Sequence, residues 1–500
     1  MEFTVPTVWW LGYWRAGDKL YWWTTAVSSS ADPLEATAAV RARVGADVWR
    51  TVTTAPAVSG PQRLASGESG VSQLLLSAGA ADWGEVHPLV GRLLAGLPGS
   101  VSEETDRRVR ELHEQLGEPQ GDSGDPDGVK AVARLLEIAV RLRSERNEAK
   151  RRAWNGPLVD RTANRDLFGK LGLLLLPPVL RAYLASFRPQ ETPMTTVVIA
   201  PGPELGRIPW ELLALREEDD LRAVEVASIR GGLSPASLVD LARPAANENA
   251  GGAALRIVDP TADDQAEDAP PIYPAGLPTR WTSESDRKRE TVSRGCTREQ
   301  FGELLNQREW ARVLFFGHVE SGDAVSPTTS ALRFSTAVQT GTDRQPLRAD
   351  DGRVLESGEE AHALSARVWL HAPNRWPMPR RVALIACEAD DSRYVEQAGL
   401  TLAAVNAGAR IVTTTRWTCP TDQSVNVAGD NVLPGEGATT AMALAVDRAH
   451  ESADPVAAIR AWQCRQLAAW RSAAQMQELR QAAPLTWACL LTYVLPDTVR

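Results

Sequence analysis

Two apolar runs, each ending in a residue with catalytic chemistry, constrain the fold of this chain most. Val313 to Gly317 leads directly into His318, and Val382 to Ala386 leads directly into Cys387. Each run has the length, the β-branched or aromatic content and the lack of polar alternation that are typical of a strand buried on both faces of a parallel sheet. Catalytic sites of open α/β sheets lie at the carboxyl ends of such strands. We therefore predict a mostly parallel α/β sheet that brings a thiol and an imidazole to one edge.

The thiol of Cys387 and the imidazole of His318 form a candidate catalytic dyad. An imidazole beside a cysteine helps to generate the thiolate nucleophile and then protonates the leaving group. Taken alone, a cysteine that ends a core strand is more often a small buried hydrophobe, and a histidine there is more often a satisfied polar residue. The chain has only five cysteines and six histidines. One of each at matching strand ends therefore favours a catalytic pair.

The sequence around the dyad resembles the CHAT family, caspase-like cysteine peptidase domains of clan CD that occur in bacterial proteins. The resemblance runs from about Leu167 to the C-terminus, and the order of His before Cys is that of caspase-like peptidases. It rests on segments that follow one another in the family's order: the strand, turn and Pro-Trp-Glu-Leu motif of Val197 to Leu213; the strand that ends in Asp259-Pro260; the helix that begins at Cys296-Thr297; Gly399 to Ala409; Ile411 to Asp422 with Arg416-Trp417; and Pro484 to Ala488, which resembles the closing strand.

This resemblance implies a caspase-like sheet flanked by helices and a cysteine endopeptidase activity. Cys387 would attack the scissile carbonyl, His318 would protonate the leaving amine, and the backbone N–H groups of Val319 and Cys387 would hold the oxyanion. This chemistry implies neither a metal ion nor a cofactor. The expected partners are a protein substrate and a separately encoded activating or regulatory protein, in a bacterial regulatory or defence system.

Two departures from the family pattern favour an alternative, a catalytically silent CHAT scaffold or protein-binding module. The family usually has Gly directly after the catalytic His, where this chain has Val319, and the turn after Cys387 reads Glu388-Ala389-Asp390-Asp391-Ser392. Val319 still supplies a backbone N–H, although a β-branched residue does not take a positive φ cheaply. Retention of both dyad residues favours the peptidase. A serine hydrolase is set aside because the sequence has no G-x-S-x-G motif.

Acidic residues near the dyad are candidates for the S1 substrate pocket. Caspase-like relatives that cleave after Arg or Lys carry a carboxylate on loops after the sheet strands, and Asp422 follows the expected strand Ile411 to Thr415 at the matching place. Such a carboxylate pairs with a guanidinium in a partly desolvated cleft. Asp is also a preferred helix N-cap, so Asp422 has an equally good structural explanation. Glu388 and Asp390 are alternative S1 acids that could equally lie, with Asp391, in an exposed loop.

Composition narrows the class of protein. The net charge of −9 gives no electrostatic basis for direct binding to nucleic acid or an anionic membrane. The five cysteines form no CxxC pair and no metal-ligand cluster, and their odd number argues against a disulfide framework, so a reducing cytoplasm fits. The first residues lack the basic and apolar regions of a signal peptide. The longest apolar stretch, Leu171 to Val179, is too short to cross a bilayer.

The sequence divides into three regions. Residues 1–118 predict a small Trp-rich α+β domain of unknown role, with a β-hairpin over Thr7 to Val27 and a helix from Ser102. Residues 119–128 predict a linker. Residues 129–500 predict the CHAT-like domain, with a helical lead-in over 129–187, including a helix from Asn164, and a sheet core over 188–500. Tryptophans in strands are more typical of core packing than of a recognition surface, and those of the first region are Trp9, Trp10, Trp14, Trp22, Trp23, Trp49 and Trp83.

Overall fold

A computed structural model of the chain describes most of the region with the family resemblance and part of the N-terminal region. The described residues are 7–29, 62–64, 71–97, 148–149, 151–189, 195–216, 220–233, 252–261, 281, 289–293, 295–320, 330–335, 347–348, 354–356, 363–386, 399–420, 422 and 437–495. Cys387, Glu388, Asp390 and Asp391 lie outside the described residues. So do the expected linker 119–128 and the helix expected from Ser102.

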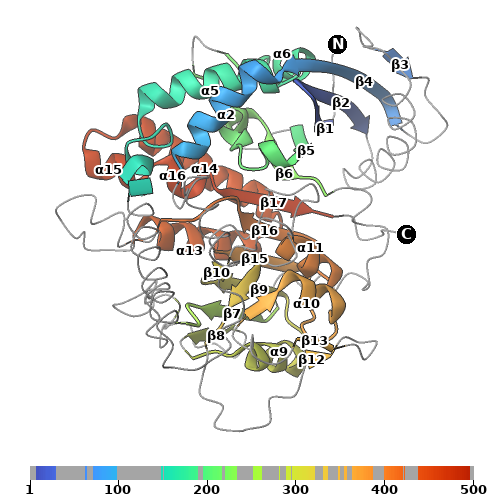
Figure 1. Cartoon of the computed structure of the whole chain (residues 1–500), viewed down its shortest axis with the longest axis vertical. Helices are drawn as coiled ribbons and strands as arrows, with labels where there is room; N and C mark the ends of the chain where they lie inside the picture. Colours follow the sequence, from blue (N-terminus) through green and yellow to red (C-terminus); the bar gives the residue numbers. More distant parts are fainter. Residues whose placement is uncertain are drawn as a thin grey trace, which may run out of the picture.

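A twelve-stranded sheet forms the centre of the described chain (Figure 1). From β1 to β8 neighbouring strands are parallel, except that β17 is antiparallel to β16. The order across the sheet is β3 (Gln62–Leu64), β4 (Val71–Asp82), β2 (Lys19–Ser29), β1 (Thr7–Ala16), β5 (Thr195–Ala200), β6 (Ser228–Gly231), β17 (Leu490–Val494), β16 (Ile411–Thr415), β15 (Arg381–Ile385), β9 (Arg312–Phe316), β7 (Ala254–Val258) and β8 (Arg289–Ser293). The mostly parallel sheet predicted from the two apolar runs is confirmed.

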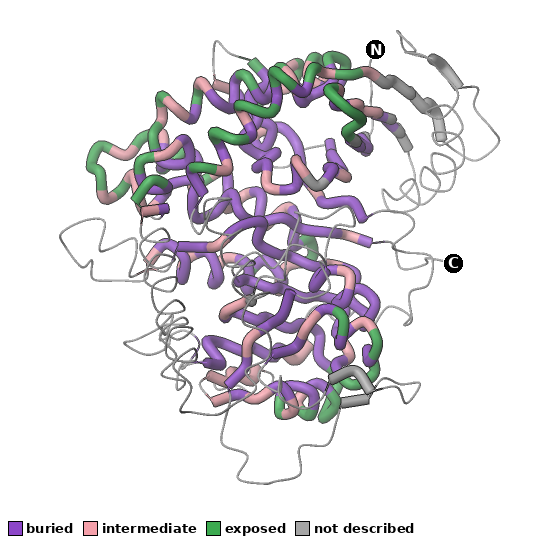
Figure 2. Tube along the Cα trace, in the orientation of Figure 1, coloured by how far each residue is buried: buried purple, intermediate pink, exposed green. Residues whose placement is uncertain are grey.

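Helices cover both faces of this sheet. One face packs against α2 (Trp83–Ala95), α5 (Arg161–Leu175), α6 (Pro178–Ala185), α13 (Ala438–Glu451) and α14 (Pro455–Ser472). The other packs against α9 (Arg298–Gln307), α10 (Ala366–His371) and α11 (Gly399–Asn406). In β9, Leu314 and Phe316 enter the first core, whereas Val313 and Phe315 enter the second. Burial on both faces explains why the strand has no polar alternation, and Figure 2 shows the central strands buried along their length.

Short elements complete the described chain. Near the ends of β9 and β15 a small sheet is formed by β10 (Val319–Glu320), β11 (Ala331–Arg333) and β14 (Ala363–Ser365), and β12 (Leu347–Arg348) pairs with β13 (Val354–Glu356). Single turns of helix are η1 (Pro203–Leu205), η2 (Trp210–Leu212) and α7 (Ala223–Val226), and α15 (Met476–Gln481) follows α14.

The N-terminal strands belong to the main sheet and not to a separate domain. The expected hairpin is present, with β1 antiparallel to β2 and Gly17 in the turn at φ 61°. β1 then pairs in parallel with β5, from Thr7 opposite Thr195 to Gly12 opposite Ala200. Tyr13 stacks on Trp210 with ring centroids 5.1 Å apart and donates a hydrogen bond to the Leu175 carbonyl. Residues of the first region therefore complete the core of the region that resembles the CHAT family.

Most tryptophans described in the first region pack in the core, as predicted. Trp9, Trp10 and Trp83 are buried. Trp22 and Trp23 are half-buried and lie over glycines on the neighbouring strands, since a Cβ atom at Gly12 would come within 2.3 Å of the Trp23 ring. These glycines leave the room that the indole rings occupy.

Two predicted boundaries need correction. The helix expected from Asn164 begins at Arg161, because the Asp160 side chain accepts the Ala163 N–H and caps it there. The segment from Pro484 that resembles the family's closing strand is instead a short helix, α16 (Pro484–Trp487), and the closing strand is β17. Proline is well suited to a first helical position, where no N–H is needed.

Candidate functional site

The strands that precede the predicted dyad are neighbours. β9 and β15 are parallel, with Arg312 opposite Arg381 and Phe316 opposite Ile385. Beyond the last pair, the Gly317 N–H donates to the Ile385 carbonyl at 3.3 Å. The two strands therefore stay together as far as the residue before His318. Their carboxyl ends lie at one edge, where sites of open α/β sheets are found.

His318 is partly exposed at this edge, and its backbone is held by the small sheet. Its carbonyl accepts a hydrogen bond from the Arg333 N–H at 3.0 Å. Val319 begins β10 and pairs with Leu332 of β11. Among the described residues, the non-glycine residues with positive φ are Asp220 and Asp259, so Val319 has an ordinary extended conformation. A β-branched residue is therefore compatible with the backbone at the position where the family usually has Gly.

Asp422 caps a helix in this structure. Its carboxylate accepts the N–H groups of Thr439 at 2.7 Å and Thr440 at 3.2 Å, and also the Thr440 hydroxyl. These groups lie in the first turn of α13, where unpaired N–H groups and the helix dipole favour a negative charge. Gly437 allows this approach, since a Cβ atom there would lie 2.1 Å from the Asp422 carboxyl carbon. Asp422 thus caps α13 from a distant segment, whereas the N-cap residue of this helix is Gly437, and the S1 role stays a prediction.

The backbone that leads from β16 towards Asp422 is anchored by two buried side chains. The Arg416 guanidinium forms an ion pair with Glu211 of the Pro-Trp-Glu-Leu motif, at 2.8 and 2.9 Å. The Trp417 indole N–H donates to the Leu485 carbonyl at 3.0 Å. Both side chains are fully buried. Landmarks far apart in the sequence thus meet at this end of β16.

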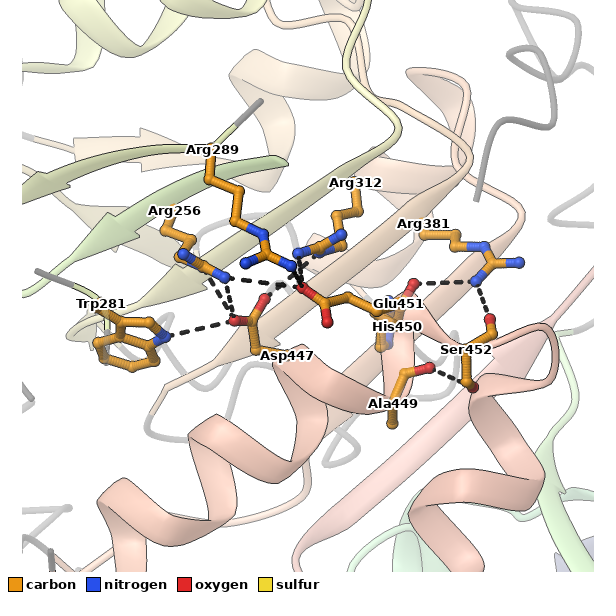
Figure 3. Close-up of polar contacts among 10 residues, drawn as sticks. All are labelled: Arg256, Trp281, Arg289, Arg312, Arg381, Asp447, Ala449, His450, Glu451 and Ser452. Atoms are coloured by element: carbon orange, nitrogen blue, oxygen red, sulfur yellow. Dashed lines mark hydrogen bonds and ion pairs between the residues drawn. The ribbon is translucent and has the colours of Figure 1, made fainter. Parts of the chain in front are cut away.

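Buried ionic contacts at the opposite edge of the sheet were missed by the sequence analysis. Figure 3 shows arginines from the strands meeting two acidic residues near the end of α13. Asp447 binds Arg256 at 2.8 Å and Arg312 at 3.5 Å, and it accepts the Trp281 indole N–H at 3.3 Å. Glu451 binds Arg312 and, at 3.0 Å, Arg289. The sequence does place an arginine, Arg312 or Arg381, directly before each apolar run. A strand pattern alone assigns such a residue to a solvent-facing strand end, so it did not indicate these contacts.

His450 lies beside these contacts as a neutral imidazole. Burial, together with the positive charge of Arg381, lowers the pKa of His450 to about 3. Its Nε2 atom is 2.8 Å from the Thr413 hydroxyl oxygen. The main-chain carbonyl of His450 accepts a hydrogen bond from Arg381 at 2.9 Å, so Arg381 also caps the end of α13. This cluster stabilises the sheet at the edge away from His318.

The described thiols are poor candidates for a nucleophile. Burial raises the pKa of Cys296 to about 12. The pKa of Cys419 is raised well above its ordinary value by a hydrogen bond with Cys489 and by burial, and burial also raises the pKa of Cys464. A thiol must lose its proton to act as a nucleophile. These environments favour the unreactive form.

The part of the chain that the structure describes contains no group of three or more His, Cys, Asp or Glu side chains placed to bind a metal ion. Its helices include none with the length and apolar character required to cross a bilayer.

The chain was compared with curated proteins, solved structures and family models. None of the curated proteins matches the chain. Among solved structures, separase from Saccharomyces cerevisiae in complex with securin is similar, with a TM-score of 0.37 and 12% identity, over 98% of this chain and 30% of the separase chain. The Arg-specific cysteine proteinase gingipain R is similar with a TM-score of 0.33 and 9% identity, over 65% of this chain and 68% of that one. The family model of the CHAT domain matches residues 165–493, so this chain belongs to the CHAT domain family.

Proposed function

We propose that the protein is a cysteine endopeptidase in which Cys387 and His318 form the catalytic dyad. The observation that carries the proposal is the in-register pairing of β9 with β15. The same register, continued by two positions on each strand, aligns His318 with position 387. Consecutive Cα atoms are about 3.8 Å apart, so Cys387, which is bonded to Ala386, is expected at the edge where His318 lies.

The alternation of side chains along the two strands also supports the dyad. Phe316 of β9 and Ile385 of β15 are opposite each other and enter the same core. Side chains two positions apart in a strand return to the same face. By this rule, His318 and the residue at position 387 are expected on one face of the sheet, as a catalytic pair requires.

In the proposed reaction, the Cys387 thiolate attacks the scissile carbonyl carbon and forms a C–S bond. The tetrahedral oxyanion is held by the N–H groups of Val319 and Cys387. As the C–N bond breaks, His318 donates a proton to the leaving amine, which leaves a thioester. Water, deprotonated by His318, then hydrolyses the thioester and restores the thiol.

The proposal extends to substrate and setting. The substrate is a protein cleaved after a basic residue, with Asp422 as the first S1 candidate and Glu388 and Asp390 as alternatives. Asp422 accepts hydrogen bonds in α13 and remains partly exposed, so its negative charge can still attract a cation. We also propose activation by a separately encoded protein, and a cytoplasmic place in a bacterial regulatory or defence system. The net charge of −9 supports a protein substrate more than a nucleic acid or a membrane.

Labelling with a peptidyl electrophile tests the dyad. The wild-type chain would be treated with Arg-, Lys- and Asp-ended peptidyl chloromethyl ketones, with and without proteins encoded by neighbouring genes. We expect labelling at Cys387 that is lost in Cys387→Ala and slowed at least tenfold in His318→Ala. His371→Ala is a matched control because it removes an exposed imidazole from α10. Labelling that is equal in the wild type and in His318→Ala would overturn the dyad and favour the silent scaffold suggested by Val319.

A further inference from the structure

The backbone just before Cys387 changes its hydrogen-bond partners where β15 ends. β15 pairs with β16 from Arg381 opposite Ile411 to Leu384 opposite Thr414. On its other side, β15 stays paired with β9 for one residue more, to Ile385 opposite Phe316. In the described chain the main-chain ladder to β16 therefore ends before Ala386, the residue that precedes Cys387.

Beyond the main-chain ladder, the side chain of Thr415 binds the backbone of Ala386. The hydroxyl of Thr415, the last residue of β16, donates to the Ala386 carbonyl. The Ala386 N–H in turn donates to the Thr415 hydroxyl oxygen, with the nitrogen 3.4 Å from that oxygen. Thr415 is fully buried and Ala386 is 3% exposed. Water therefore does not compete for these groups, and the hydroxyl holds the Ala386 peptide towards β16.

The direction of the Ala386 carbonyl has a consequence for the next N–H. A peptide group is planar and trans, so its C=O and N–H point in opposite directions. Because the Ala386 carbonyl points to β16, the N–H that follows it is expected to point away from β16, to the side of β9. We infer that Thr415 is a positioning residue that aims the Cys387 N–H at the oxyanion and orients the nucleophile, an inference that rests on the proposed function.

The two preceding threonines of β16 provide internal comparisons. Thr413, Thr414 and Thr415 are all fully buried. The Thr413 hydroxyl is 3.0 Å from that of Thr492 and also binds His450, far from the predicted dyad. The Thr414 hydroxyl has no hydrogen-bond partner among the described residues. Replacement of Thr414 by Val thus makes the same chemical change in the same strand without removing a described hydrogen bond.

The test compares Thr415→Val, Thr415→Ser and Thr414→Val in the full chain. With a fluorogenic Arg peptide, Thr415→Val should lower kcat by about 10²-fold, the loss typical of one oxyanion donor, with little change in KM. Labelling of Cys387 by iodoacetamide should fall less than fivefold, because alkylation forms no oxyanion. Thr415→Ser should restore most of kcat, and Thr414→Val should match the wild type. A folded Thr415→Val that keeps kcat within twofold would overturn the inference.

Amide hydrogen exchange tests the role of Thr415 without relying on catalytic activity. In Thr415→Val the segment that ends at Cys387 should exchange at least tenfold faster than in the wild type, whereas in Thr414→Val it should not. Wild-type chain that neither cleaves nor labels, even with the proteins encoded by neighbouring genes present, would refute the proposed function alone. Unchanged exchange in Thr415→Val would refute the role of Thr415, whether or not the chain is a peptidase.

Discussion

Glu211 and Arg416 form a buried, two-pronged ion pair that joins the segment after β5 to the end of β16. Arg416 is fully buried, Glu211 is 3% exposed, and the same guanidinium donates to the Ala488 carbonyl at 3.0 Å. The pair connects the Pro-Trp-Glu-Leu motif to the Arg-Trp motif, two of the landmarks of the CHAT resemblance. Both motifs are therefore explained by their contact with each other, apart from any part in catalysis.

Glu211→Ala should lower the free energy of unfolding by about 3–5 kcal/mol, because it leaves the Arg416 charge buried without its carboxylate. The double variant Glu211→Leu/Arg416→Met should recover most of this loss, since it removes both charges. Glu204→Ala is the control: its pair with Arg15 spans 3.8 Å between partly exposed side chains, and its loss should cost less than about 1 kcal/mol. Denaturant unfolding measures all three, and equal losses for Glu211→Ala and Glu204→Ala would contradict the argument.

Tyr13→Ala should destabilise the whole sheet and not only the N-terminal hairpin. The side chain is buried between Trp210 and α5, and removal of a large buried aromatic costs about 3–5 kcal/mol. Tyr21→Ala, in the partly exposed part of the same hairpin, should cost about 1 kcal/mol or less. The measurement is thermal unfolding followed by circular dichroism. A separate early transition for Tyr13→Ala, with the main one unchanged, would restore the separate N-terminal domain that the sequence suggested.

The thiols of Cys296, Cys419 and Cys464 should stay unmodified when the folded protein is treated with iodoacetamide at pH 8. Their raised pKa values keep them largely protonated there. Mass spectrometry of peptides reports each site. In denaturant all of them should label at similar rates. Rapid native labelling of Cys419, which follows β16, would contradict its burial.

The free energy of unfolding should fall as the pH drops from about 6.5 towards 3, in part because of His450. Its folded-state pKa of about 3 lies below the unfolded value of about 6.5. The unfolded chain therefore takes up a proton in this window that the folded chain refuses, and the loss is complete below the lower value. His450→Gln should remove this part of the pH dependence in urea titrations. The same replacement at exposed His371 should leave it in place.

Asp422→Asn separates the two roles of this residue. The amide oxygen of Asn can still accept the Thr439 N–H, whereas its NH2 group cannot accept the Thr440 N–H, so the loss of stability should be smaller than in Asp422→Ala. If Asp422 also forms S1, loss of its charge should cost about 2–4 kcal/mol, at least a thirtyfold drop in cleavage after Arg or Lys. Asp422→Ala should lose the cap as well, at about 1 kcal/mol of stability. If Asp422→Asn keeps the wild-type preference for Arg or Lys across a panel of peptides, Asp422 acts only as a helix cap.

The strands β9 and β15 and their place side by side in a parallel sheet could be predicted, because burial on both faces leaves a clear apolar run in each. The contacts between distant segments could not. Asp422 caps α13 across a segment whose sequence gives no sign of where the helix will lie, and Tyr13 packs on Trp210 although both look like local features of their own strands. Arg312 begins its strand as a solvent-facing residue would, and only the packing of α13 shows that Asp447 and Glu451 bury it.

Helix α13 is held at both ends, by Asp422 at the edge of the predicted dyad and by the strand arginines at the other edge. A helix fixed in this way cannot slide along the sheet without breaking buried ion pairs, a change too costly for each catalytic cycle. In the proposed peptidase, α13 would therefore be a fixed reference for the position of a substrate at the carboxyl edge. Substitutions at Asp447 or Glu451, which lie at the opposite edge of the sheet, would then shift the position of a bound substrate in the proposed peptidase.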